Sequence, residues 1–188
     1  MIRPTLPDIF EAKNRIAPYI VRTPLHRHLG LDKLLGAEIY VKHENYQKLG
    51  AFKVRGGINL LSQMPQADLN RGISTASSGN HGQSIAYAAN LFGAKAIIGV
   101  PEGANPSKVE SMRNLGAQII FNGAHFDQTR SYIEGLSGEK GYRYVHPVNE
   151  PSLIAGVGTY SLEIIEDLPQ VDVIVVPIGG GSGASGAC

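Results

Sequence analysis

The chain has almost no cysteine, no tryptophan and nearly no net charge. Its single cysteine, Cys188, cannot form an intrachain disulfide, which excludes a small disulfide-stabilised scaffold. The 17 Lys and Arg residues are balanced by 16 Asp and Glu residues. No excess of positive charge therefore points to nucleic acid or to an anionic membrane surface, and we expect a small-molecule partner.

Long apolar runs are also missing. No stretch approaches the roughly 18 to 20 apolar residues that a membrane-spanning helix needs. The first residues lack the apolar core of a secretory signal. We therefore expect no membrane role and a cytoplasmic location. The length of 188 residues and the hydrophobic fraction of 43% suit one good domain or two small ones.

Strand-like and helix-like segments alternate along most of the sequence. A helix over residues 8–19, with Asp8 as its cap, and extended segments at 23–25 and 38–42 come first. The predicted strands that follow are 73–76, 94–100, 117–121, 142–145 and 171–177, and the predicted helices are 80–92, 107–115, 126–136 and 152–168. This alternation is typical of a parallel sheet with helices on its faces, so the predicted fold class is α/β.

Lys53 follows Phe52 at the start of a predicted helix. Partial desolvation there would lower the pKa of the amine and make it a nucleophile. Such an amine can form a Schiff base with an aldehyde, including that of pyridoxal phosphate. The alternative is a solvated lysine in a basic patch with Lys48 and Arg55.

Two later loops also follow predicted strands, where ligands bind in open parallel sheets. Residues 76–83 offer hydroxyls, a glycine and an asparagine at a helix start, which suits a carboxylate, although Ser77 or Ser78 could simply cap the helix. Residues 177–186 can form a glycine nest for phosphate. Residues 181–186 also fit a dinucleotide motif, but the acidic residue expected about 20 positions later would lie past Cys188.

Four segments in order resemble the threonine dehydratase and serine racemase group of fold-type II pyridoxal phosphate enzymes. They are Lys-Leu-Gly-Ala-Phe-Lys-Val-Arg-Gly at 48–56, Ser-Ser-Gly-Asn-His-Gly-Gln at 77–83, the segment 146–159 and the glycine loop 179–183. The resemblance, over residues 6–188, implies two open, mostly parallel, three-layer domains like those of tryptophan synthase β. The large domain would comprise residues 1–70 and 142–188, and the small domain residues 71–141. Members of this group are longer, so we expect the chain to be part of a longer polypeptide that completes the large domain.

The resemblance also implies roles for individual residues. Lys53 would carry the cofactor, Phe52 would pack against its ring and Asn80 would bind the 3′-oxygen of that ring. The cofactor phosphate would be held by Gly179, Gly180, Gly181, Ser182 and Gly183. The substrate carboxylate would be held by Ser77, Ser78, Gly79, His81 and Gln83. In serine racemases the position of Ser78 is also the acid or base opposite the lysine, and the segment 144–151 would line the substrate side.

The activity implied is that of a lyase that dehydrates and deaminates threonine, serine or a substituted 3-hydroxy amino acid to a 2-oxo acid and ammonia. Amino acid racemisation is the main alternative. A β-replacing enzyme usually has threonine at the position of His81, so the histidine argues against that activity. A dinucleotide-dependent oxidoreductase and a non-catalytic chain are further alternatives. The resemblance implies a homodimer.

Some positions depart from the group. Ala51 replaces a usual serine, Val157 a common glutamine, Ser182 the fourth glycine of the phosphate loop and Gly183 a leucine or methionine. These changes affect the expected substrate rather than the cofactor. We expect no metal site, because the neighbouring pair His26 and His28 has no third ligand nearby in the sequence.

Overall fold

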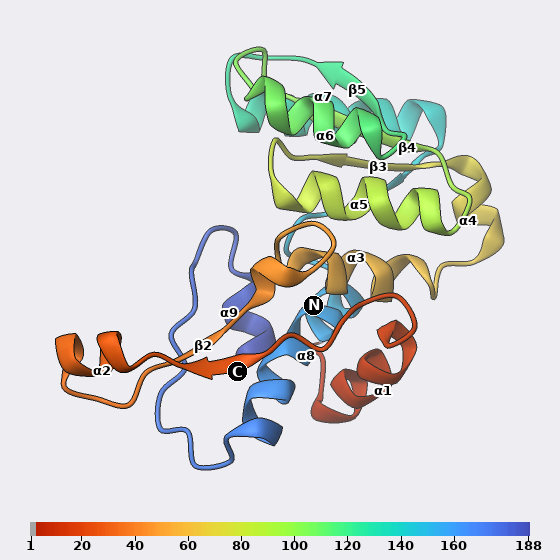
Figure 1. The fold of residues 1–188 in the computed structure, drawn as a ribbon. Helices are drawn as coiled ribbons and strands as arrows, with labels where there is room; N and C mark the ends of the chain where they lie inside the picture. Colours follow the sequence, from red (N-terminus) through yellow and green to blue (C-terminus); the bar gives the residue numbers. More distant parts are fainter. Residues whose placement is uncertain (1–2) are drawn as a thin grey trace.

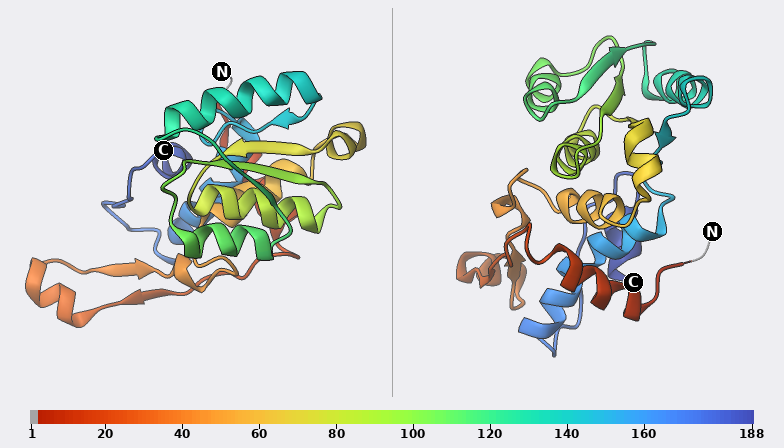
Figure 2. Two further views of the ribbon diagram at one scale, coloured as in Figure 1. Left: turned by 90° about the horizontal axis from the view of Figure 1, so that it is seen from above. Right: turned by 90° about the vertical axis from the view of Figure 1, so that its right-hand side faces the viewer.

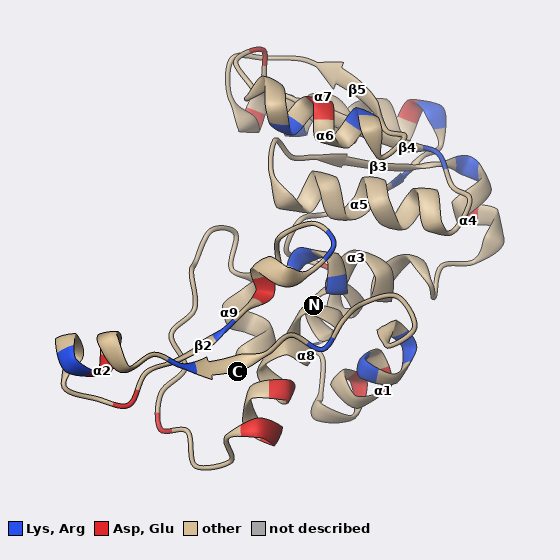
Figure 3. Cartoon of the chain, viewed as in Figure 1, with Lys and Arg blue, Asp and Glu red and all other residues tan. Residues whose placement is uncertain are grey.

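The computed structural model describes residues 3–188, which form a sheet-containing part and a mainly helical part (Figure 1). The elements are α1 (Leu6–Ile16), β1 (Leu25–Arg27), α2 (Leu29–Leu35), β2 (Tyr40–Lys42), the 3-10 helix η1 (Glu44–Tyr46), α3 (Lys53–Leu61), α4 (Gln66–Arg71), β3 (Ile73–Ala76), α5 (Asn80–Leu91), β4 (Ala96–Val100), α6 (Pro106–Asn114), β5 (Gln118–Phe121), α7 (Phe126–Lys140), β6 (Arg143–Tyr144), α8 (Pro151–Asp167) and α9 (Ser182–Ala187). Lys, Arg, Asp and Glu residues are spread over both parts (Figure 3).

Four strands form a parallel sheet in the order β5-β4-β3-β6. Helices α5 and α6 cover one face and α7 the other (Figure 2). An added Cβ on Gly99 of β4 would lie 2.3 Å from Ile133 of α7, so α7 packs directly on the central strand. Both β3 and β4 are buried along their whole length, as expected for strands that are covered on both faces, and β4 is apolar throughout. The α/β prediction is confirmed.

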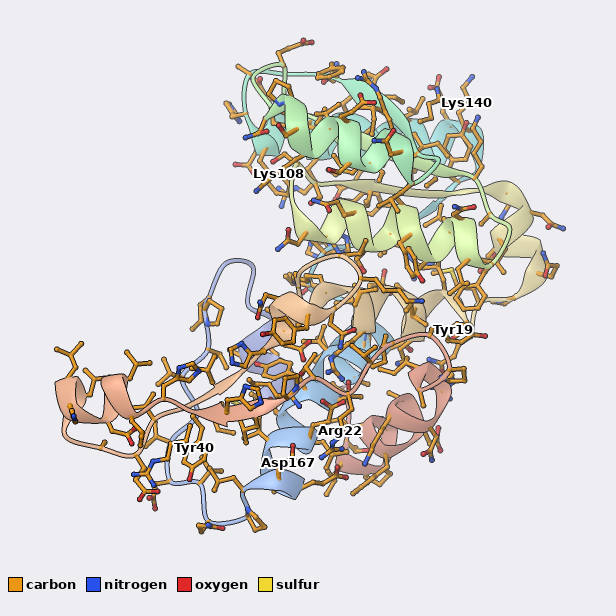
Figure 4. All side chains as sticks on the ribbon, in the orientation of Figure 1. Tyr19, Arg22, Tyr40, Lys108, Lys140 and Asp167 are labelled. Carbon is orange, nitrogen blue, oxygen red and sulfur yellow. The ribbon has the colours of Figure 1, made fainter. Side chains whose placement is uncertain are left out.

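The N-terminal helix begins slightly earlier than the sequence suggested. Thr5 is its N-cap, and both the backbone N–H and the hydroxyl of Thr5 donate to Asp8 at 2.6 Å. The prediction that Asp8 is the N-cap was wrong. Asp8 is the third residue of the helix, and its carboxylate accepts the hydrogen bonds of the N-cap Thr5 in a capping box. After α1, Arg22 forms an ion pair with Asp167, the last residue of α8 (Figure 4).

Helix α3 lies between α5 and α8, and two glycines let it approach both. An added Cβ on Gly57 would be 2.2 Å from the hydroxyl of Ser84 in α5. An added Cβ on Gly56 would be 2.7 Å from the carbonyl oxygen of Leu153 in α8. Only residues without a side chain fit at such separations, and α3, which begins at Lys53, consequently packs closely against both helices.

The predicted strand at residues 171–177 is wrong. This segment is not a strand, and its side chains of Val173 and Val175 are 74% and 91% exposed. A strand needs a neighbour to pair its backbone groups, and among residues 3–188 no strand is paired with this segment. The two extended N-terminal segments, in contrast, form the antiparallel hairpin β1-β2, which carries α2 at its tip away from the main body (Figure 1). In the described part of the chain, no helix is long and apolar enough to cross a membrane.

Candidate active site

Lys53 is the first residue of α3, and its amine is partly buried. Its Nζ lies 5.5 Å from the centroid of the Phe52 ring. Burial lowers the pKa of Lys53 below its ordinary value, because the charged form loses hydration. The hydroxyl of Ser84, which the sequence did not single out, donates to the Lys53 carbonyl oxygen at 2.6 Å. The backbone of the lysine is thereby fixed against α5.

The Lys53 amine reaches the glycine loop. Its Nζ donates to the hydroxyl of Ser182, which is the first residue of α9 and is 1% exposed. The preceding Gly181 has φ +97°, a conformation that residues with a side chain rarely adopt. The sequence placed Lys53 and Ser182 in one site by resemblance, and the structure brings the two side chains into contact.

Phe52 is held by residues on two other helices. An added Cβ on Gly183 would lie 3.1 Å from the Phe52 ring, so the glycine allows close packing. The ring of Tyr160 on α8 lies 5.5 Å from that of Phe52, and its hydroxyl donates to the Gly183 carbonyl oxygen at 3.1 Å. Sequence reasoning missed Tyr160, because its helical spacing only marks it as a core position of α8.

The loop before α5 is organised by Ser77. Its hydroxyl oxygen accepts the backbone N–H groups of Gly79 at 3.3 Å and Gly82 at 3.1 Å. Ser77 therefore has the capping role that was the alternative to ligand binding. The side chains of Ser78, Asn80 and Gln83 are at least partly exposed and form no side-chain hydrogen bond within residues 3–188. Their polar groups are not used to hold the loop.

His81 is buried one residue into α5. Its Nε2 is 3.1 Å from the hydroxyl of Thr75, which in turn donates to the Val145 carbonyl oxygen at 2.8 Å. Since the Thr75 proton is already committed, His81 carries its proton on Nε2 and leaves Nδ1 as an acceptor. Burial, together with the nearby Lys53 and His146, lowers the pKa of His81 to about 3. Within residues 3–188 this Nδ1 has no partner.

The segment 144–151 lies against the glycine loop. An added Cβ on Gly180 would be 2.5 Å from a methyl group of Val148. The segment is held in a turn by His146, whose Nδ1 accepts the backbone N–H groups of Val148 at 3.2 Å and Asn149 at 3.0 Å. The structure therefore places this segment beside the residues predicted to hold phosphate.

The residues present fit pyridoxal phosphate. A partly buried amine of lowered pKa is available to its aldehyde. Added Cβ atoms on Gly79, Gly179 and Gly181 would meet no other heavy atom within 4 Å, so open space adjoins both loops. The unpartnered acceptor of His81 is a further buried polar atom near Lys53.

A buried ion network fixes the helix that carries Lys53. Arg55 is fully buried and donates to both carboxylate oxygens of Glu163 at 2.7 and 3.0 Å, and to those of Glu44 at 2.8 and 2.7 Å. The Nζ of Lys42 is 2.6 Å from Glu163. Burial alone would lower the pKa of Arg55, but the hydrogen bonds to Glu44 and Glu163 raise it above its ordinary value. Helix α3 is thereby joined to α8 and η1.

Known proteins resemble this chain in sequence and in fold. The chain matches the family described as "Pyridoxal-phosphate dependent enzyme" over residues 16–188. It is 45% identical to an L-threonine ammonia-lyase of Thermotoga maritima over 97% of its own length and 45% of that protein. It is 39% identical to an L-threo-3-hydroxyaspartate ammonia-lyase of Saccharomyces cerevisiae, covering all of this chain and 57% of that protein.

A solved structure of maize serine racemase superimposes with a TM-score of 0.93 at 38% identity, covering 98% of this chain and 56% of that one. The chain spans about half the length of the relatives it matches. These relatives are members of the threonine dehydratase and serine racemase group that the sequence motifs resemble. The chain therefore belongs to the family of pyridoxal-phosphate dependent enzymes.

Proposed function

We propose that the protein is an ammonia-lyase that dehydrates and deaminates a small 3-hydroxy amino acid, with Lys53 as its catalytic residue. The observation that carries this proposal is the contact of the Lys53 amine with Ser182, beside the glycine loop. The names of the similar threonine and 3-hydroxyaspartate ammonia-lyases support the choice of reaction.

Lys53 would both hold the cofactor and move a proton. Because burial lowers its pKa, a larger fraction of the amine is neutral at physiological pH than for a solvated lysine. When it is not bonded to the cofactor, the neutral Nζ could accept the proton from the substrate Cα. Pyridoxal phosphate, when bound, supplies a conjugated ring that takes up the negative charge left at Cα.

The two loops would position the cofactor and the substrate. The amides of residues 179–183, with the Ser182 hydroxyl, would hold the phosphate, and Phe52 and Asn80 would contact the ring. The start of α5 would bind the substrate carboxylate through Ser77, Ser78, Gly79, His81 and Gln83, with backbone N–H groups and the helix dipole favouring an anion. In this arrangement His81 contributes backbone rather than its ring, because its free Nδ1 is an acceptor.

The last step of the reaction would be hydrolysis of an enamine that has left the site. Loss of the Cα proton and of the β-hydroxyl removes one water from the amino acid and gives an enamine. Hydrolysis of the enamine consumes one water and releases ammonia, so that threonine would give 2-oxobutanoate. The protein's task is to hold the Cα–H bond near Lys53 while the carboxylate is fixed, which is a matter of orientation.

Racemisation is the second candidate, and Ser78 is the residue that would supply its second acid or base. A racemase needs an acid or base on each side of Cα, and Ser78 would stand opposite Lys53, as the corresponding position does in serine racemases. The similar fold of maize serine racemase supports keeping this candidate. We also propose that the chain divides into a large domain (1–70 and 142–188) and a small domain (71–141). The protein would form a homodimer.

A substrate panel separates the two candidates. The full-length protein is incubated with threonine, serine and 3-hydroxyaspartate, and both 2-oxo acid release and the chirality of the remaining amino acid are measured. Release of 2-oxo acid with little D-amino acid supports the lyase. Accumulation of the D-isomer without 2-oxo acid would support the racemase instead of the lyase. If neither product forms, both candidates are rejected.

A further inference from the structure

We propose that His26, His28 and His43 bind one divalent transition-metal ion, such as Zn²⁺, on the β1-β2 hairpin. Three of the six histidines of the chain meet here. His26 lies in β1, His28 is the residue that follows β1, and His43 is the residue that follows β2. It lies outside the set of residues proposed to act on the amino acid.

Two of the imidazoles already have the separation of metal ligands. The Nε2 atoms of His28 and His43 are 3.4 Å apart. Zinc binds histidine nitrogen at about 2.0–2.1 Å, and two such bonds at a tetrahedral angle place the nitrogens about 3.3–3.4 Å apart. In the free protein this pair can share one proton as a hydrogen bond, and a metal ion would replace that proton.

His26 is the third ligand. Its ring centroid is 5.2 Å from that of His43, with an angle of 60° between the rings. As the structure stands, no group of three or more His, Cys, Asp or Glu side chains within residues 3–188 is placed to hold a metal ion, so His26 would have to move. Because the His26 side chain is exposed, it can rotate toward the other two at little cost, and water would complete a four-coordinate site.

The backbone and a neighbouring ring hold the cluster in place. The N–H of His28 donates to the Ile39 carbonyl oxygen at 2.9 Å, and that of His43 donates to the Pro24 carbonyl oxygen at 3.0 Å. Tyr46 stacks on His43 with centroids 5.2 Å apart and 18° between the planes. The ring at the centre of the cluster is therefore fixed before any ligand arrives, which reduces the entropy lost on binding.

Nearby charge does not oppose a cation. Arg27, between His26 and His28 in the sequence, donates to Asp32 at 2.7 Å and lies 2.9 Å from Glu38. The adjacent Glu44 is paired with Arg55. A metal ion here would tie β1 to the start of η1, and through Glu44 to the network that fixes the Lys53 helix.

Equilibrium dialysis of the full-length protein against Zn²⁺ at pH 7.5 tests the site. We expect saturable binding of one ion, weakened at least tenfold in His43→Gln and in His28→Gln, and weakened to a smaller degree in His26→Gln. His125→Gln is the matched control, because His125 is an exposed histidine at the start of α7, and it should bind as the unaltered protein does. Far-UV circular dichroism verifies that each variant is folded.

The pH dependence supplies a second readout. Binding should weaken on acidification, since protons compete with the metal ion for the ring nitrogens. Absence of saturable binding, or equal binding by His43→Gln and the unaltered protein, would overturn the proposal. Binding lost in His125→Gln but retained in His28→Gln would do so as well.

Discussion

The amine of Lys53 donates a hydrogen bond to the hydroxyl of Ser182, although 129 residues separate them in the sequence. The contact joins the first residue of α3 to the first residue of α9. Since Ser182 follows three consecutive glycines, the amine is brought to the loop best suited to phosphate. The account of the site depends on this pairing.

Ser182→Ala should weaken cofactor binding without unfolding the protein. Loss of one hydroxyl hydrogen bond is worth about 1 kcal/mol, which corresponds to roughly a fivefold higher dissociation constant for pyridoxal phosphate. Titration followed by the visible absorbance of the bound cofactor measures it. Ser185→Ala, at an exposed position of the same helix, should leave the constant unchanged. Unchanged affinity in Ser182→Ala would show that the hydroxyl does not face the cofactor.

His81 should make the protein sensitive to acid. Its pKa is about 3 when folded and about 6.5 when unfolded, so between these values the unfolded chain binds a proton that the folded one does not. Stability from this group is complete above pH 6.5 and is lost as pH falls, by about 2 kcal/mol between pH 7 and pH 5. Urea unfolding of His81→Gln should show a drop smaller by about that amount. Equal drops in His81→Gln and the unaltered protein would mean that His81 is protonated in the folded state.

Two glutamates on α8 should differ strongly in their contribution to stability. Glu163→Gln removes a charge from a buried network with Arg55 and Lys42, and should lower the free energy of unfolding by about 3–5 kcal/mol. Glu166→Gln, three residues later, weakens partly exposed pairs with Lys13 and Arg22 and should cost less than about 1 kcal/mol. Chemical denaturation compares them directly. Similar costs for the two substitutions would contradict the buried network.

Two glycine-to-alanine substitutions in helices should have opposite signs. Gly57→Ala would push a methyl group into Ser84 and separate α3 from α5, with a cost of at least about 2 kcal/mol. Gly135→Ala in α7 meets no atom within 4 Å and should stabilise the protein by up to about 1 kcal/mol, because alanine has the better helix propensity. Thermal unfolding of both variants provides the measurement. A stable Gly57→Ala protein would show that α3 and α5 are not in close contact.

Much of the fold followed from local sequence. The alternation of apolar strands with helices gave the parallel sheet, since buried strands and the glycines between elements leave a clear pattern. The segment 171–177 was misjudged for a physical reason. Its apolar residues indicate a buried strand, but pairing depends on a neighbour that local sequence does not identify, and Val175 is exposed instead.

The site was only partly predictable. The motif around Lys53 and the glycine loop were visible in the sequence, but the contact between Lys53 and Ser182 needed the fold. Tyr160 carries no distinguishing pattern, because a buried tyrosine on a helix looks like an ordinary core residue. The histidine cluster was missed for a similar reason, since His43 lies 15 residues from His28 and only the hairpin brings them together.

The most direct test of the central claim locates the cofactor on the chain. The full-length protein is incubated with pyridoxal phosphate, reduced with borohydride to fix the cofactor covalently, and digested for mass spectrometry. We expect the label on Lys53, and we expect Lys53→Ala to lose both the visible absorbance and 2-oxo acid formation, while Lys48→Ala keeps both. Label on Lys48, or normal turnover by Lys53→Ala, would contradict the account.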